Sequence, residues 1–522
     1  MTLRSPSDEA PEPAPEPAGR REWIGLAVLA LPALLASLEL TVTNLALPSI
    51  GRDLVASSTQ LLWTVDIYAF LLSGSLITMG AWGDRVGRRR VLLIGAAGYG
   101  AASLLAAYAV NIEMLIAARA LMGVAGATLM PSTLTLTAAL FAHPRQRATA
   151  IGVIIASVSG GTAIGPLVGG WLLDRFWWGS AFLLAVPVMV LLLLLVPVLL
   201  PEHRGPDRRR LDIRSALLSI AAVLPIVYGV KQIAAGGADV TAVLPVVGGI
   251  AMAAIFVDRQ RRLADPFIDL SLFRNRIFAT AAATLALGIF VLWGSNYAIA
   301  QYLQLVEGLT PLDAGLWTAP SALGVIAGST LAPRLAHRYE PTRIIGTGLV
   351  LSTIGYAVLT QVGGHNGLAI LVTGAVIVSA GLGPMMALAT DMLIGAAPPE
   401  RAGAAAAIST TAPQLGGALG IAVLGSVITA TYRRMVDGAA SADAPDTAVT
   451  AFEDNLSATS AASEQLAEPL ATQLLNTARD AFVTGFQLAA VISAMLMAGT
   501  AALIIVRGGQ GRSKNVSDHT RD

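Results

Sequence analysis

The chain has 522 residues, of which 55% are hydrophobic and 13% are charged, with a formal net charge of +1. Soluble domains carry about 25% charged residues, so this composition excludes an ordinary soluble protein and predicts an integral membrane protein. The near-zero net charge predicts no nucleic-acid partner, and the lack of cysteine excludes disulfides, thiolate metal sites and cysteine nucleophiles.

The elements predicted first are a tail and a series of membrane spans. Residues 1–22 contain a proline-rich acidic run and predict a disordered cytoplasmic tail. Fourteen apolar segments follow, each about long enough to cross ~30 Å of hydrocarbon as a helix. They are residues 24–47, 60–81, 91–110, 113–134, 148–172, 178–200, 214–233, 239–257, 277–300, 312–335, 343–361, 367–388, 403–430 and 480–506.

Basic residues predict the orientation of these segments. With both termini in the cytoplasm, most of the 34 basic residues fall on the cytoplasmic side, as the positive-inside rule requires. Lys231, one of only two lysines, falls among the few basic residues assigned to the outer surface. Neither lysine follows a glycine-rich phosphate loop, so a Walker-type ATPase is excluded and the energy source must lie outside the chain.

A weak internal repeat predicts two halves. One shift along the chain carries three glycines of the fifth segment onto three glycines of the thirteenth: Gly161, Gly165 and Gly170 onto Gly416, Gly420 and Gly425. Repeated halves are a transporter layout. The predicted fold is therefore all-α: two six-helix bundles related by a pseudo-two-fold axis, plus two inserted helices. The expected divisions are a tail 1–22, an N-terminal bundle 23–200, a linker with two extra helices 201–276, a C-terminal bundle 277–506 with a solvated outer hairpin 431–479, and a cytoplasmic tail 507–522.

The fifth segment is rich in glycine, and Gly161, Gly165 and Gly169 recur at every fourth position. The residues of this pattern are Gly152, Gly161, Gly165, Pro166, Gly169 and Gly170. Such a stripe lets a neighbouring helix approach closely, and a proline within it removes one backbone hydrogen bond and bends the helix. A packing face is therefore the simplest interpretation, and a helix that packs tightly while it rocks is the functional one.

Three ionisable residues lie within apolar segments: Glu39, Asp66 and Arg119. The predicted topology puts them in the outer half of the bilayer, where an uncompensated charge costs at least ~2.5–3.5 kcal/mol, so we expect them to face the interior or one another. One interpretation is a structural ion pair. The other is a carboxylate that alternates between a proton and a cationic substrate.

A short glycine-rich and basic loop joins the second and third segments on the predicted cytoplasmic side. Its candidate residues are Gly80, Asp84, Arg85, Gly87, Arg88 and Arg89. Charge alone predicts a tight basic turn. Functionally, Asp84 can accept hydrogen bonds from an arginine or a helix N-terminus and so hold an inner gate closed.

Four aromatic residues are candidates to line a substrate cavity: Trp63, Tyr68, Trp293 and Tyr297. Trp63 and Tyr68 flank Asp66, and each aromatic face can contribute ~0.5–2 kcal/mol to binding of a cation. The alternative for each of them is packing or interfacial anchoring.

Together these motifs resemble the major facilitator superfamily, and within it the fourteen-helix drug:proton antiporters. The run Gly80 to Arg89 resembles the family's cytoplasmic loop signature, and the glycine pattern resembles its antiporter signature. Leu38–Pro48 resembles its first-helix signature, with Glu39 where aspartate is usual, and Trp63–Tyr68 resembles the second helix of the quaternary-ammonium exporters. The resemblance implies that Glu39, Asp66 and Arg119 couple protons to cation movement.

The expected function is proton-coupled export of lipophilic, mainly cationic compounds across the bacterial cytoplasmic membrane by alternating access. We expect small-molecule substrates, protons and membrane lipids as partners, a monomeric active form, and no cofactor or metal. An exporter of one endogenous amphiphile, such as a lipid or secondary metabolite, is the alternative. A membrane-embedded enzyme is disfavoured because all five histidines fall in loops or the tail, and a non-transporting scaffold has no need of intramembrane acids.

Overall fold

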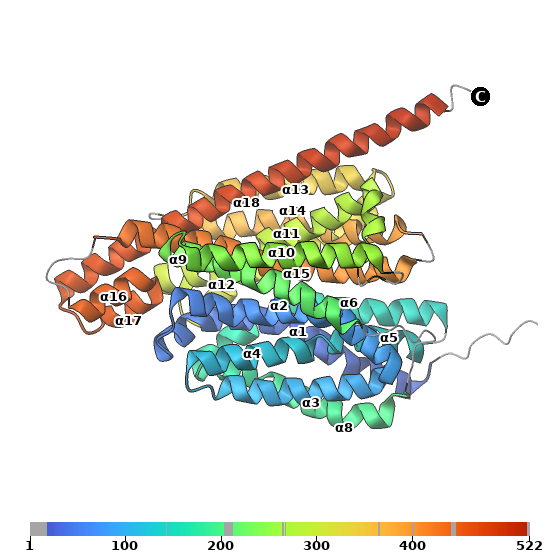
Figure 1. Ribbon diagram of the computed structural model, residues 1–522, viewed down its shortest axis with the longest axis horizontal. Helices are drawn as coiled ribbons and strands as arrows, with labels where there is room; N and C mark the ends of the chain where they lie inside the picture. The colour runs from blue at the N-terminus through green and yellow to red at the C-terminus, as the bar shows by residue number, and fades with distance from the viewer. Residues whose placement is uncertain are drawn as a thin grey trace, which may run out of the picture.

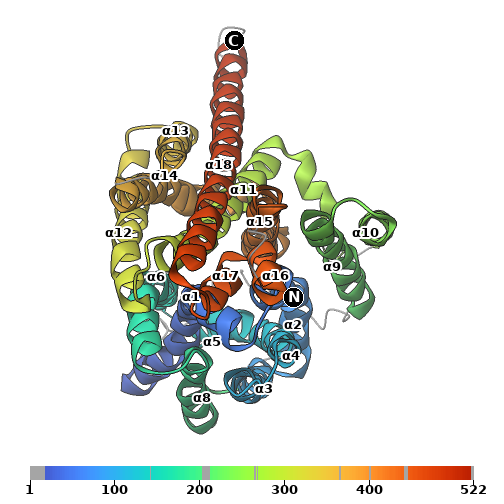
Figure 2. The same ribbon diagram turned by 90° about the vertical axis from the view of Figure 1, so that its left-hand side faces the viewer.

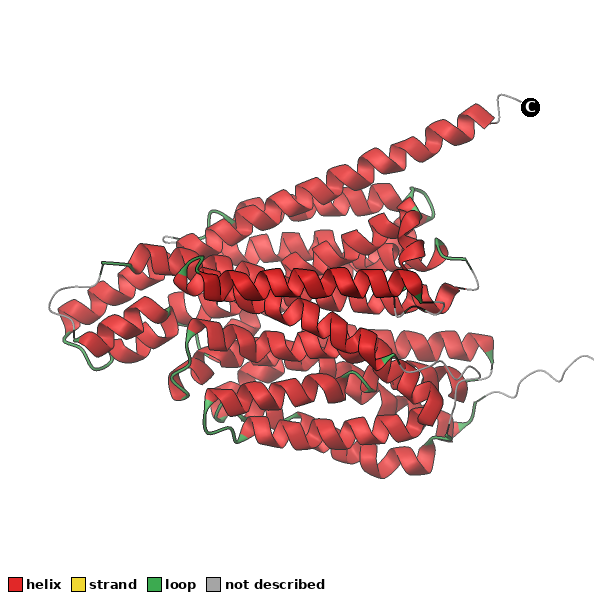
Figure 3. Ribbon diagram, in the orientation of Figure 1, coloured by secondary structure: helices red, strands yellow, loops and turns green. Residues whose placement is uncertain are grey.

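The computed structural model describes residues 18–141, 143–202, 212–263, 266, 268–363, 366–398, 401–439 and 445–518. Most of the predicted tail 1–22 lies outside the described residues. Within the described part every regular element is helical (Figure 3). This agrees with the predicted all-α class.

The first half of the chain forms eight helices. Two predicted spans are interrupted: the fourth is divided into α4 and α5, and the sixth into α7 and α8. The bounds are α1 (Arg20–Asp53), α2 (Ser58–Val86), α3 (Arg88–Ala107), α4 (Ile112–Gly126), α5 (Leu129–Leu140), α6 (Pro144–Arg175), α7 (Ser180–Leu183) and α8 (Ala185–Leu199).

Two helices, α9 (Ile213–Gly236) and α10 (Val240–Arg262), follow and pack on one another. The second half then contains the remaining elements. These are the 3-10 helix η1 (Leu270–Arg274), α11 (Arg276–Gln301), the π-helix η2 (Tyr302–Val306), α12 (Pro311–Ala336), α13 (Pro341–Leu359), α14 (Gly367–Gly395), α15 (Ala402–Val436), α16 (Asp446–Asp454), α17 (Leu456–Ser463) and α18 (Glu468–Asp518).

Thirteen helices within the described ranges are long and apolar enough to cross a membrane. The helix α12, expected as a fourteenth span, is 26 residues long but falls outside this set, because Gly, Ser, Thr and Pro dilute its apolar residues. Large apolar side chains such as Leu194 of α8 and Leu244 of α10 are about two-thirds exposed. Exposed apolar surface of this kind fits contact with lipid.

Each half has its own apolar core, and α9 and α10 lie beside both. One core consists mainly of residues of α1–α8, and the other mainly of residues of α11–α18. Figure 1 shows these two layers of helices one above the other, and Figure 2 shows α9 and α10 on one side, next to α2 and α15. Two helical bundles with an accessory pair at their seam is the arrangement that the repeat predicted.

The two ends of the molecule differ. The short helices α16 and α17 cap one end, here called the hairpin end, and α1 begins and α18 ends at the opposite end, here called the termini end (Figure 1). The expected solvated hairpin over 431–479 needs correction. Phe452 and Leu456 are buried, and α15 and α18 extend into this region. The helix α17 packs on α16 and α18 and contacts α1, and α16 also contacts α15.

Candidate functional site

Glu39 of α1 and Arg119 of α4 form a buried ion pair inside the first half. Arg119 Nη1 donates to Glu39 Oε1, and the Tyr99 hydroxyl of α3 donates to Glu39 Oε2. Arg119 Nε also donates to the Thr64 carbonyl oxygen at 2.9 Å. The Tyr68 ring centroid lies 4.3 Å from Arg119 Cζ. Four helices therefore hold this pair by directed contacts.

Asp66 of α2 forms a second buried ion pair with Lys231 of α9. The distance from Lys231 Nζ to Asp66 Oδ2 is 2.8 Å, and both side chains are fully buried. The same Nζ lies 4.1 Å from the centroid of the Trp63 ring, whose other neighbour is the ring of Tyr228 at 6.5 Å. A carboxylate and an indole thus surround one ammonium group.

These pairs differ in part from the expectation. Glu39 and Arg119 face one another, as the cost of an isolated charge in hydrocarbon predicts, but Asp66 has a different partner. Lys231 is buried between helices and is not at the outer surface, which corrects its assignment. The sequence carried a signal for this: a lysine inside an apolar inserted helix, and an intramembrane Asp66 without an assigned cation.

The four aromatic candidates do not surround one carboxylate. Trp63 packs on Lys231, whereas Tyr68 covers Arg119 on the other ion pair. Trp293 packs so closely on Gly417 of α15 that a Cβ there would overlap its ring, and Tyr297 is buried. Trp63 and Trp293 do border one apolar cluster between α2, α9 and α15.

The loop between α2 and α3 is held by ion pairs within the first half. Arg88 Nη2 lies 2.5 Å from Asp84 Oδ1, and Glu202, which the sequence analysis missed, accepts from the Arg89 backbone N–H at 3.0 Å. Gly87 has a φ of +123°, and a Cβ there would lie 2.5 Å from Glu202 Oε1. The sequence did contain a signal for Glu202. It is an acidic residue directly after the sixth apolar segment, on the same predicted side of the membrane as the basic loop.

Gly80 and Arg85 of the loop signature are less tightly packed than Gly87 and Arg88. Gly80 has Pro131 of α5 as its nearest side chain, with room for a Cβ at 3.8 Å, and Arg85 is exposed. Arg85 makes no described side-chain hydrogen bond or ion pair with Asp84. The signature therefore divides into a tight turn at Asp84–Arg89 and looser flanking positions.

The glycine pattern of α6 faces two different helices. A Cβ at Gly161 would overlap the Leu34 carbonyl oxygen of α1, and one at Gly169 would lie 2.7 Å from Val42 Cγ2 of the same helix. Gly165 is equally close to Thr41 of α1. By contrast, a Cβ at Gly170 would lie 2.6 Å from the Pro311 carbonyl oxygen of α12, in the second half.

Two further residues complete this pattern. The Pro166 carbonyl oxygen is in close contact with Gly315 of α12, and Gly152 has no atom within 4 Å of its virtual Cβ. The helix α6 therefore packs tightly on α1 by its central glycines and on the opposite half only near its hairpin end. Gly152 takes no part in either interface.

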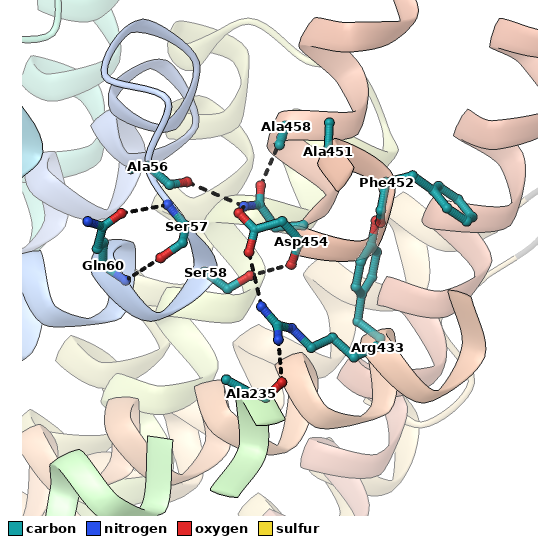
Figure 4. Close-up of polar contacts among 12 residues, drawn as sticks. Ala56, Ser57, Ser58, Gln60, Ala235, Arg433, Ala451, Phe452, Asp454 and Ala458 are labelled. Atoms are coloured by element: carbon teal, nitrogen blue, oxygen red, sulfur yellow. Dashed lines mark hydrogen bonds and ion pairs between the residues drawn. The ribbon is translucent and has the colours of Figure 1, made fainter. Parts of the chain in front are cut away.

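Polar contacts connect the halves at the hairpin end. Ser58 Oγ of α2 donates to the Asp454 carbonyl oxygen at 2.6 Å, and Arg433 Nη2 lies 3.1 Å from Asp454 Oδ1 (Figure 4). Arg433 Nη1 donates to the Ala235 carbonyl oxygen near the end of α9 (Figure 4). One cluster thus joins the first half, the inserted pair and the second half.

Two further hydrogen bonds join the second half to α1 at the hairpin end. Ser457 Oγ of α17 donates to the Pro48 carbonyl oxygen at 3.0 Å, and Gln304 Nε2 donates to the Leu45 carbonyl oxygen at 3.0 Å. Both acceptors are on α1. The hairpin end is therefore closed by direct contacts between the two halves.

Two helical bundles that meet at one end, with buried ion pairs between apolar helices, define a multi-pass membrane transporter. The sequence model of the Major Facilitator Superfamily matches residues 29–421, and the chain belongs to this family. It is a transporter family, so the protein is not an enzyme.

Individual relatives cover nearly the whole chain. The sequence is 41% identical to the multidrug efflux pump LfrA of Mycolicibacterium smegmatis, over 93% of this chain and 96% of that protein. It is 32% identical to the methyl viologen resistance protein SmvA of Salmonella typhimurium, with 94% and 97% covered. It is 35% identical to the puromycin resistance protein pur8 of Streptomyces alboniger, with 81% and 84% covered.

Solved structures agree on the fold. A bacterial homologue of the human lysosomal transporter Spinster superposes with a TM-score of 0.63 at 16% identity, covering 94% of this chain and 98% of that one. The peptide transporter POT gives a TM-score of 0.61 at 16% identity, over 92% of this chain and 95% of its own. These likenesses support the two-bundle architecture.

Proposed function

We propose that this protein exports lipophilic, mainly cationic drugs across the bacterial cytoplasmic membrane in exchange for protons. The similarity to LfrA over almost the full length of both chains is the observation that carries the proposal. The name of SmvA, which refers to resistance to methyl viologen, an organic dication, supports cations as substrates. The expected monomeric form, the fourteen spans and the cytoplasmic termini belong to the same proposal.

In this proposal the hairpin end faces outward and the termini end faces the cytoplasm. The contacts of α16 and α17 then close the outer side, and the substrate enters between the halves from the cytoplasm or the inner leaflet. The loop from Asp84 to Arg89 lies at the termini end of α2, where it would close the inner gate in the opposite state. Its ion pairs within the first half support a released gate in the present one.

Proton coupling is assigned to the two buried carboxylates. A proton on Glu39 would weaken its pairing with Arg119, and a proton on Asp66 would weaken its pairing with Lys231. Either change alters contacts between helices that pack on one another, so proton arrival from the outer side can drive a rocking motion and release of substrate. A structural role in helix packing is the competing interpretation for the Glu39 pair.

The test is ethidium-driven proton movement in proteoliposomes. We expect the intact protein to exchange ethidium for protons, and we expect Glu39→Gln and Asp66→Asn each to reduce the exchange at least tenfold. A monodisperse profile in size-exclusion chromatography serves as the folding control. If both variants exchange protons for ethidium as well as the intact protein does, the coupling assignment is wrong.

Export of a single endogenous amphiphile is the second candidate function. It is supported by the similarity to pur8, a protein named for resistance to one compound, puromycin. Expression in a pump-deficient bacterial host separates the two. Increased tolerance to several unrelated lipophilic cations supports multidrug export. Unchanged tolerance, with one host lipid accumulating outside the cell, supports the second candidate.

A further inference from the structure

The inserted helix α9 lies on the seam between the two halves. Its Val227 shares one apolar cluster with two residues from each half: Ala69 and Phe70 of α2, and Ala418 and Ala422 of α15. Lys231 follows one helical turn after Val227 and so points from the same face of α9. Figure 2 shows α9 beside α2 and α15. The inserted helix therefore places the Lys231 ammonium group next to the apolar cluster where α2 and α15 meet.

The surroundings of this ammonium group are those that recognise an organic cation. Asp66 supplies one carboxylate at 2.8 Å, and Trp63 supplies an aromatic face with its centroid at 4.1 Å. Carboxylates and aromatic faces are also the groups that bind quaternary and aromatic ammonium ligands in proteins. Here the bound cation is a side chain of the protein itself.

The two buried ion pairs are held differently. Tyr99 also donates to Glu39, and Arg119 also donates to the Thr64 carbonyl oxygen, so several hydrogen bonds fix the geometry of this pair. The Asp66 and Lys231 side chains lie within hydrogen-bonding distance of one another, and neither makes a hydrogen bond to a third described residue. The second pair therefore lacks the additional hydrogen bonds of the first, and lysine is a compact charge on a flexible four-carbon stem. It is therefore the pair that an incoming cation can break.

We propose that Lys231 is a tethered counter-ion that occupies the position of the substrate's cationic group. An organic cation then reaches Asp66 and Trp63 only by displacing the lysine ammonium. The displaced group is within two helical turns of the end of α9, close enough for its stem to carry it towards water. The inference rests on the proposed function and deepens it, because it names the residue that selects for positive charge.

This exchange explains selection for charge at the site. A cation replaces one positive charge on Asp66 by another, so the buried carboxylate is never left unpaired. A neutral compound offers no replacement and leaves the pair intact. Lys231 is accordingly a specificity-determining residue contributed by the inserted helix pair.

The test is ethidium binding to the full-length protein in nanodiscs, measured by fluorescence titration. Lys231→Met removes the competing charge at similar length, so ethidium should bind at least tenfold tighter than to the wild type. Lys231→Arg replaces the ammonium by a guanidinium that can bind the carboxylate at two points, so ethidium should bind at least tenfold more weakly. The double variant Asp66→Asn with Lys231→Met should not show this tighter binding of ethidium, because the carboxylate is absent.

A chemical competitor provides an independent readout. n-Butylammonium copies the end of the lysine side chain, so it should weaken ethidium binding to Lys231→Met and leave the wild type unchanged. Size-exclusion chromatography and the charge-balanced double variant control for folding. If Lys231→Met does not fold, the comparison of Lys231→Arg with the wild type decides the question.

Binding measurements test the tethered counter-ion, whereas transport measurements test the proposed function. Ethidium affinities that are equal in the wild type, Lys231→Met and Lys231→Arg overturn the tethered counter-ion, even if transport is normal. A wild-type protein that moves no lipophilic cation in proteoliposomes counts against the proposed function itself. A gain in Lys231→Met that butylammonium reverses supports the inference in either case.

Discussion

For the two intramembrane acids, Glu39 and Asp66, the sequence predicted burial but not the pairing partner. Their presence in apolar segments predicted burial, because isolated charges are costly there. Their partners could not be predicted, since pairing depends on how each helix is rotated about its axis. Glu39 pairs with Arg119, whereas Asp66 pairs with Lys231, a residue close enough to a helix end to be mistaken for a surface charge.

The Glu39–Arg119 pair leads to a prediction about stability. Arg119→Gln leaves a buried carboxylate without its cation, and breaking a buried pair in this way costs about 3–5 kcal/mol. The double variant Glu39→Gln with Arg119→Gln leaves no net charge, so it should unfold at a higher temperature than Arg119→Gln alone. Thermal unfolding in detergent measures the difference. A double variant no more stable than the single one would falsify a direct charge contact.

Asp454 leads to a prediction about pH. Burial raises the pKa of this carboxyl above its ordinary value of 3.8, and the Arg433 guanidinium opposes the effect only in part. A raised pKa in the folded state contributes stability that is complete below the pKa of the unfolded chain and is lost as the pH rises through the folded pKa.

The matched comparison for Asp454 is the variant Asp454→Asn, which does not titrate at this position. From about pH 4 upward, the wild type should lose thermal stability relative to the variant. Other titrating groups are common to both proteins and cancel in the difference. Parallel melting temperatures across this range would show that Asp454 binds its proton equally well in the folded and unfolded chains.

Among the elements, the glycine-rich helices α6 and α15 are used in equivalent ways. Gly161 and Gly165 fit against α1, the first helix of the first half. Gly416 and Gly420 fit against backbone carbonyl groups of α11, the first transmembrane helix of the second half. Gly170 meets α12 and Gly425 meets Leu62 of α2, each across the boundary between halves. The repeat in the sequence was therefore a reliable sign of symmetry, because each of these glycines lies where another helix approaches closely.

These contacts predict which glycines tolerate a methyl group. Gly161→Ala and Gly420→Ala each place a Cβ onto a backbone carbonyl, and such overpacking costs about 1–3 kcal/mol. Gly160→Ala is the matched control, since its virtual Cβ has no atom within 4 Å and alanine is the better helix former. Melting temperature and ethidium export should fall in the first two variants and stay level in the control. Equal losses in all three would mean that flexibility, and not close packing, explains the pattern.

For the whole molecule, hydropathy and the repeat predicted the two bundles and the inserted pair, because lipid imposes long apolar helices on the sequence. The cap formed by α16 and α17 escaped prediction. Its helices are short and polar, and their position depends on contacts with α1 and α2 that lie hundreds of residues away in the chain. The closed hairpin end is thus a tertiary property that local sequence patterns do not encode.

This closure can be weakened without touching either ion pair. Ser457→Ala and Gln304→Leu together remove two hydrogen bonds to α1, worth about 2 kcal/mol in sum, which shifts a two-state equilibrium about thirtyfold towards an open hairpin end. Because the chain has no cysteine, spin labels at Asp53→Cys and Thr472→Cys report the distance between halves without background labelling. A longer-distance population should appear in the double electron–electron resonance distribution. Ser463→Ala removes a hydroxyl that bonds only within α17 and should leave the distribution unchanged, whereas a similar shift in this control would assign the effect to the stability of the cap.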